Sequence, residues 1–161
     1  MEPSGSLLGP LLSTMRERHA DLVNLLAGLP QGALDWRPAI AAGSLAGITG
    51  HILVVEEAAL RLAAGEAIPW PGANGEGMGD HRTEAELLAG LAALDALAAR
   101  AVLALTAARL AEPQPGEERT IGAMLVEEFD HCAMHYGQAQ LTRHLWEAAN
   151  PSWVSPYVHW R

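Results

Sequence analysis

The chain has one cysteine, few aromatic residues and few basic residues, and each scarcity excludes a class of protein. Cys132 alone cannot build an intramolecular disulfide framework or a cysteine-based zinc module. Aromatic residues make up 5% of the chain and hydrophobic residues 50%, which favours packed helices over a sandwich of strands. The formal net charge of −9 argues against a nucleic-acid surface and against an anionic membrane face. Solubility is a sufficient explanation of the acidic surface.

Long hydrophobic runs are also missing. The first residues, MEPSGSLLGPLL, lack a basic segment followed by a long apolar run, so we expect no signal peptide. No stretch approaches about 20 uncharged apolar residues, so we expect no transmembrane span. The sequence therefore predicts a cytoplasmic protein. Its length suits one domain over residues 1–161 that is large enough to bury a core.

Four amphipathic segments, separated by glycine and proline, predict four helices at about residues 7–26, 44–64, 83–110 and 120–149. Ser44 suits the N-cap of the second helix, and Thr83 with Glu86 has the spacing of a capping box at the third. Apolar residues in the second helix follow a core-facing stripe: Leu45, Ile48, Ile52, Val55, Ala59 and Leu62. No segment reads as a strand. The predicted fold class is all-α, a four-helix bundle.

The segment 66–82 between the second and third helices is rich in glycine and proline, which predicts a loop. Its 17 residues can span about 55 Å, whereas a 21-residue helix is about 31 Å long. The loop can therefore return along the bundle and leave helices two and three parallel. We expect a long crossover here, and an active-site lid is the other interpretation.

The motif DHCAMHYGQ, residues 130–138, places His131 and His135 four residues apart. Four residues of α-helix turn through about 400°, so both imidazoles lie on one face, about 6 Å apart along the axis. Two neutral imidazoles in this geometry can share a metal ion.

Apolar residues flank this histidine row on both sides. They are Phe129, Cys132 and Tyr136 on one side, and Met134, Leu141 and Leu145 on the other. We therefore expect the row to face inward or into the mouth of a pocket. Burying two imidazoles costs free energy unless their nitrogens find partners, and a shared metal ion is one way to provide them.

A third ligand is needed to complete such a site, and His51, in the apolar run ITGHILVV, is the best candidate. A lone histidine in an apolar helix is also explained as a hydrogen-bonded core residue, so both interpretations stay open here. His19 follows Arg16, Glu17 and Arg18, which favours a solvated position. The remaining histidines are less suitable by position: His81 in a loop, His144 off the histidine row, and His159 in the tail.

The combination of LDWRP (34–38), His51 in the second helix and HxxxHxGQ (131–138) resembles the DinB/YfiT superfamily over most of the chain. The resemblance implies a four-helix bundle with up-down-down-up topology. It also implies a divalent metal ion, zinc or nickel, held by the residues at matching positions, His51, His131 and His135. Gln138 matches the glutamine of the family and is expected to support a ligand. The alternative role of Gln138 is packing and hydrogen bonding within the bundle. Many relatives have arginine where this chain has Tyr136, which affects substrate or supporting contacts rather than the ligand set.

Three histidine ligands leave an open position for water or substrate, the pattern of a catalytic metal site. Some members of the superfamily that the chain resembles are thiol-dependent S-transferases or isomerases. The resemblance therefore implies a metal-dependent enzyme acting on a small molecule, with transfer to a low-molecular-weight thiol as its expected reaction. The alternative is a non-catalytic, stress-related protein that binds a metal or another ligand. Relatives often form homodimers, so we expect one here; alternatively, Trp153 and Trp160 cap their own end of the bundle.

Two other kinds of metal enzyme do not fit the residues. A thermolysin-type site needs HExxH, but Cys132 follows the first histidine. A di-iron bundle needs two ExxH motifs, whereas we find one, from Glu128 to His131. Glu128 either orients an imidazole or is a solvated carboxylate at the edge of the helix. Cys132 is expected to be a small buried hydrophobic residue.

Overall fold

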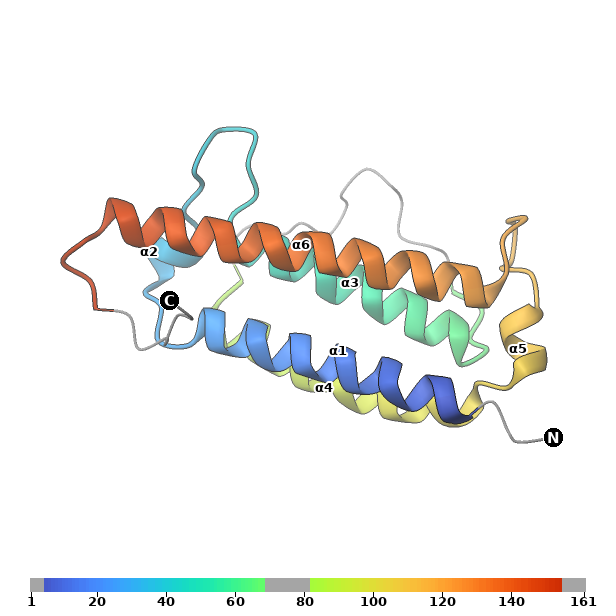
Figure 1. The fold of residues 1–161 in the computed structure, drawn as a ribbon. Coiled ribbons are helices and arrows are strands. Elements are labelled where there is room, and N and C mark those ends of the chain that lie inside the picture. The colour runs from blue at the N-terminus through green and yellow to red at the C-terminus, as the bar shows by residue number, and fades with distance from the viewer. Residues whose placement is uncertain (1–4, 69–81, 155–161) are drawn as a thin grey trace.

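The computed structural model describes residues 5–68 and 82–154, and every regular element within these ranges is a helix (Figure 1). The all-α prediction is therefore confirmed. The elements are α1 (Gly5–Leu26), α2 (Gln31–Leu34), α3 (Leu45–Ala63), α4 (Glu84–Ala104), α5 (Ala107–Ala111) and α6 (Ile121–Ala149).

The four long helices pack around a shared core. Helix α3 contacts α4 and α6, and α1 contacts the same two helices from the other side. Figure 1 shows α1 and α6 running in one direction and α3 and α4 in the other. The most extensive packing is between α3 and α6, the two helices that carry the HxxxH motif and His51.

Side-chain caps fix where three of these helices begin. The Ser44 hydroxyl accepts a hydrogen bond from the backbone N–H of Gly47, and Thr120 caps α6 in the same way. Thr83 and Glu86 form both halves of a capping box at the start of α4. Each cap satisfies a backbone donor that the first turn leaves unpaired. The predicted starts of the last three long helices are therefore confirmed to within a residue or two.

The third predicted helix ends earlier than expected, and the prediction that it continues to residue 110 is wrong. Helix α4 stops at Ala104, because Leu105 adopts an extended backbone conformation. The Thr106 side chain then accepts a hydrogen bond from the backbone N–H of Arg109 and begins the separate helix α5. A threonine hydroxyl that caps a new helix competes with continuation of the old one.

The hydrophobic core lies where the four long helices meet. The apolar stripe predicted on α3 is buried at every position: Leu45, Ile48, Ile52, Val55, Ala59 and Leu62. At one end of the bundle, the fully buried Arg143 of α6 donates a hydrogen bond to the backbone carbonyl of Leu25 in α1. The Trp153 ring packs 4.6 Å from the Arg143 guanidinium and 5.0 Å from the Trp146 ring. Trp153 therefore covers its own end of the bundle.

His19 is buried, so the expectation of a solvated position is wrong. Its side chain is 4% exposed; its Nε2 lies 3.0 Å from Glu56 Oε2 of α3, and its Nδ1 lies 2.7 Å from Asp95 Oδ1 of α4. Burial alone would lower the pKa of His19, but the hydrogen bonds and charges of Glu56 and Asp95 outweigh it and raise the pKa. A protonated imidazole donates to both carboxylates and links α1, α3 and α4.

Three sequence features fall largely or entirely outside the described residues. These are the predicted crossover over residues 66–82, His81, and the tail with Tyr157, His159 and Trp160. Among the described helices, α4 alone is long and apolar enough to cross a membrane by length and composition. Helix α4 contacts α1 and α3, and its Asp95 side chain bonds to His19 of α1. The cytoplasmic location stays a prediction.

We expect His19 to make the stability of the bundle depend on pH. Because its pKa in the folded state is raised above 6.5, its stabilising contribution is complete below that pH and is lost as the pH rises through the folded-state pKa. Substituting His19→Gln should cost about 3 kcal/mol at about pH 6, because Glu56 then lacks its buried partner, and clearly less at about pH 9. Urea unfolding of both proteins at the two pH values measures the difference.

The exposed His144 provides the matched control for this experiment. His144→Gln should cost clearly less than His19→Gln at about pH 6, because an exposed side chain leaves no buried carboxylate without its partner. A cost of His19→Gln that is constant or increases with pH would contradict the protonated link.

Candidate metal centre

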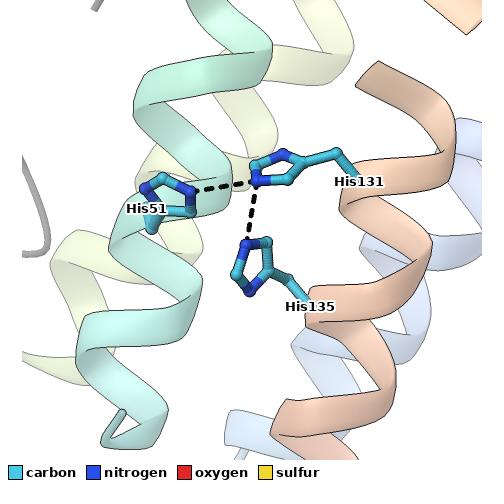
Figure 2. Close-up of side chains that lie close together, drawn as sticks. All are labelled: His51, His131 and His135. Carbon is cyan, nitrogen blue, oxygen red and sulfur yellow. Dashed lines mark hydrogen bonds between the residues drawn. The ribbon is translucent and has the colours of Figure 1, made fainter. Parts of the chain in front are cut away.

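Packing of α3 against α6 places the candidate metal centre. Ile48 and Ile52 are buried on α3, and this anchoring turns the intervening His51 toward α6. On α6, the four-residue spacing presents His131 and His135 from one face toward α3, as Figure 2 shows. His51 and His131 are partly exposed and His135 is buried, so the group lies at the edge of the core, within reach of solvent.

The three imidazoles meet through their Nε2 atoms (Figure 2). His131 Nε2 lies 3.3 Å from His51 Nε2 and 2.9 Å from His135 Nε2. The rings stand nearly perpendicular to one another, with centroids 4.4 to 5.1 Å apart. The structure thus brings together the three histidines that the sequence singled out.

This geometry suits a divalent metal ion. Nitrogen ligands at about 2.0–2.1 Å in a tetrahedral site stand about 3.3 Å from each other, close to the separations between these Nε2 atoms. A proton on one Nε2 atom can bridge one neighbouring pair, but it cannot satisfy three converging lone pairs. A cation between the rings satisfies all three, and the donor set fits zinc, nickel, copper and iron alike.

Two of the three rings are oriented by neighbours on α6. His135 Nδ1 lies 2.8 Å from Gln138 Oε1, and because an amide oxygen can only accept, Nδ1 carries the proton and Nε2 is left with a lone pair. His131 Nδ1 lies 3.4 Å from Glu128 Oε1, a longer contact of the same kind. Glu128 is buried, which excludes the solvated alternative for this residue. Among the described residues, the buried Nδ1 of His51 has no hydrogen-bond partner.

The electrostatics of the group favour neutral imidazoles. Burial, followed by the charges that His135 and His131 would carry, lowers the pKa of His51. Burial also lowers the pKa of His135, against the opposing effect of its bond to Gln138. Neutral rings are the form that binds a metal ion, so the lowered pKa values of His51 and His135 favour binding.

Cys132 lies beside the histidines but faces the core. Its Sγ lies 3.1 Å from Glu128 Oε1, and burial is the largest of the effects that raise the pKa of this thiol. Glu128, His131 and Cys132 also lie close enough to hold a metal ion, but a buried thiol with a raised pKa is a poor ligand. The predicted role of Cys132 as a small apolar residue therefore fits its surroundings.

The two flanks of the histidine row differ in burial. Phe129, Cys132 and Tyr136 pack against the core. On the other flank Met134, Leu141 and Leu145 are exposed by 53%, 59% and 41%. Helical angles alone do not distinguish the two flanks. The packing of α1 and α3 against α6 decides which flank is covered.

An open cleft begins at His135 on the exposed flank. Its volume is ≈430 Å³, and its walls are the segment 38–43, Ile48 of α3 and the C-terminal half of α6. At Gly43 a Cβ atom would stand only 2.7 Å from Ile48 Cγ1, so glycine allows this segment to lie against α3. This wall was not predicted from the sequence. The small residues AAG (41–43), which follow LDWRP, are the feature that indicates a close approach of this segment to a helix.

Removing one imidazole should change the titration of its neighbours. In the metal-free protein, His131→Ala should raise the pKa of His51 and of His135, because a neighbouring charge that disfavours their protonation is gone. An NMR titration of the imidazole resonances measures both values, with His144→Ala as the control. Unchanged or lower pKa values in His131→Ala would contradict the convergence of the three rings.

The comparisons with known proteins agree with this geometry. A search of curated proteins finds no significant match to the chain. A family model for the DinB superfamily matches residues 14–139, which include His51, His131, His135 and Gln138. The match covers most of the 161 residues, and the chain belongs to the DinB superfamily.

Proposed function

We propose that His51, His131 and His135 bind one divalent metal ion, zinc or nickel, and that the protein is a metal-dependent enzyme that transfers a small electrophilic substrate to a low-molecular-weight thiol. The observation that carries the proposal is the convergence of three Nε2 atoms from two helices. Membership of the DinB superfamily supports it. Three protein ligands with a cleft beside them are typical of catalytic rather than structural metal sites.

The bound metal ion would supply Lewis acidity, by which a thiol is held as thiolate or a water molecule is polarised. The chain supplies the orientation. Gln138 keeps the proton of His135 on Nδ1, and Glu128 does the same for His131 at a longer distance. Residues that hold a ligand histidine in this way raise its basicity and fix the direction of its lone pair.

The proposed transfer balances without an oxidant or a reductant. The sulfur lone pair of the thiolate forms a bond to the electrophilic carbon of the substrate. The bond from that carbon to its leaving group breaks, and the leaving group departs with the bonding electrons. The thiol proton passes to solvent.

The bundle topology belongs to the same proposal. We infer that α1, α3, α4 and α6 form an up-down-down-up bundle. The directions of the helices in Figure 1 and their mutual contacts support this order. It places α3 and α6 side by side and antiparallel, which sets His51 against the HxxxH motif.

A protein that holds a metal or apolar ligand without turnover is the alternative. The half-exposed position of the site favours an enzyme, because a structural metal is usually enclosed by four protein ligands. Turnover that depends on both metal and thiol distinguishes the two functions.

Metal content tests the ligand set. Native protein loaded with zinc or nickel should hold about one ion per chain after dialysis, by elemental analysis. His51→Ala and His135→Ala should lose the ion, whereas His144→Ala should keep it. Gln138→Ala should weaken binding about 10- to 100-fold, because it removes only the support of one ligand. Equal metal content in native protein and His51→Ala would remove His51 from the site.

Thiol transfer tests the reaction. With cysteine or glutathione as thiol and monobromobimane as electrophile, the metal-loaded protein should accelerate formation of the fluorescent thioether, with bromide as the leaving group. His135→Ala or a chelator should reduce the enzymatic rate about 100-fold or more, because the Lewis acid is lost. A metal-loaded native protein that accelerates neither thiol would favour the binding-protein alternative.

A further inference from the structure

Among the hollows that the described residues line, the cleft at His135 differs in position and size from the two at His19 and between α3 and α4. It starts at a proposed metal ligand and follows α6 to Leu145, ten residues or about 15 Å along the helix. Its volume of ≈430 Å³ lies within the range of small-molecule sites, about 300–1,000 Å³.

The walls of this cleft carry no formal charge among the described residues. Apolar surface comes from the segment 38–43, from Ile48 of α3, and from Leu141 and Leu145 of α6. The polar groups are the His135 imidazole, the Gln138 amide and the Thr142 hydroxyl.

The exposed leucines indicate that something apolar is bound here. Leu141 and Leu145 are exposed by 59% and 41% on a helix whose opposite side is buried in the core. Large apolar side chains that line a concave surface beside polar groups are typical of ligand sites. An ion in this cleft would lose hydration without gaining a charged partner.

The other hollows do not suit such a ligand. The cavity beneath the histidines, lined by His19, Glu56, Glu128 and Cys132, has a volume of ≈30 Å³, enough for about two water molecules. A third hollow, ≈240 Å³ between α3 and α4, is lined by Arg61, Arg82 and Arg100, and it lies outside the histidine site.

We propose that the cleft binds the electrophile of the reaction, and that this substrate is an uncharged, largely apolar small molecule. Its apolar body lies against Leu141 and Leu145, and its reacting polar end lies at His135. One neutral polar group along its length can bond to Gln138 or Thr142. The charged groups of a thiol such as glutathione therefore lie outside the cleft, so the two reactants approach the metal from different directions. That the bound molecule is the electrophile of the reaction rests on the proposed function. That the cleft binds an uncharged, largely apolar molecule does not.

Binding of two matched probes to the metal-free protein tests the cleft. Phenylnaphthylamine is uncharged and fluoresces in apolar surroundings, and anilinonaphthalene sulfonate adds one negative charge to the same skeleton. We expect one site for the neutral probe and binding at least about tenfold weaker for the sulfonate. Backbone amide NMR signals of Gln138, Leu141 and Thr142 should shift with the neutral probe.

Two leucine variants locate the site. Leu141→Asp places a charge in the cleft and should weaken binding of the neutral probe at least about tenfold. Leu103→Asp is the matched control, because Leu103 is 86% exposed on α4 and does not line the cleft. It should leave binding unchanged. Circular dichroism of both variants shows whether each remains folded.

Several outcomes would overturn the inference: no binding of the neutral probe, equal binding of both probes, equal loss in both folded variants, or shifts confined to other helices. Should Leu141→Asp fail to fold, Leu145→Asp provides the second cleft variant, because Leu145 also lines the cleft and is 41% exposed. Because these measurements use metal-free protein, they can succeed while the metal or thiol experiments fail, and the reverse.

Discussion

The packing of α3 against α6 is the contact on which the candidate metal centre depends. Buried Ile48 and Ile52 hold the helices together, and the same contact forces three imidazole nitrogens into a space where they cannot satisfy one another. Hydrophobic burial thus provides the free energy that holds unfavourably close lone pairs in place. A divalent cation would turn this cost into coordination, and this is the physical basis of the proposed role of His51 as a ligand.

The surroundings of the site are asymmetric, because one side faces the core and the other faces an open cleft. On the core side, Glu128 contacts both His131 and Cys132, and the adjoining cavity is far too small for a substrate. On the other side, His135 forms the end of a neutral cleft that is open to solvent. The proposed electrophile would therefore approach along this cleft, while the core side holds the histidines in position. This division between support and access is what a three-ligand metal site needs for turnover.

The link through His19 is a second electrostatic centre, and it lines the same small cavity as Glu128 and Cys132. It joins α1, α3 and α4 through two carboxylates, whereas the metal centre joins α3 and α6. The charged residues 16–18 next to His19 favoured a solvent-exposed position for its side chain, and this prediction is wrong. Its partners Glu56 and Asp95 come from two other helices, 37 and 76 residues away in the chain. Charge pairing across helices leaves no periodic signal in one helix.

The sequence by itself determined the helices, their capping residues and the common face of His131 and His135, because each depends on residues within a turn or two of one another. Glu128 was found for the same reason, since it lies three residues from the histidine that it contacts, whereas the family resemblance indicated Gln138. The family resemblance added His51, which geometry within one helix could not select over a core role.

Only the tertiary structure decided the rest. It showed that the Nε2 atoms converge, which flank of α6 is open, that His19 is buried, and that the segment 38–43 forms a cleft wall. Each of these depends on how separate helices and a connecting segment pack, and side-chain periodicity contains no record of the neighbour that covers a given face.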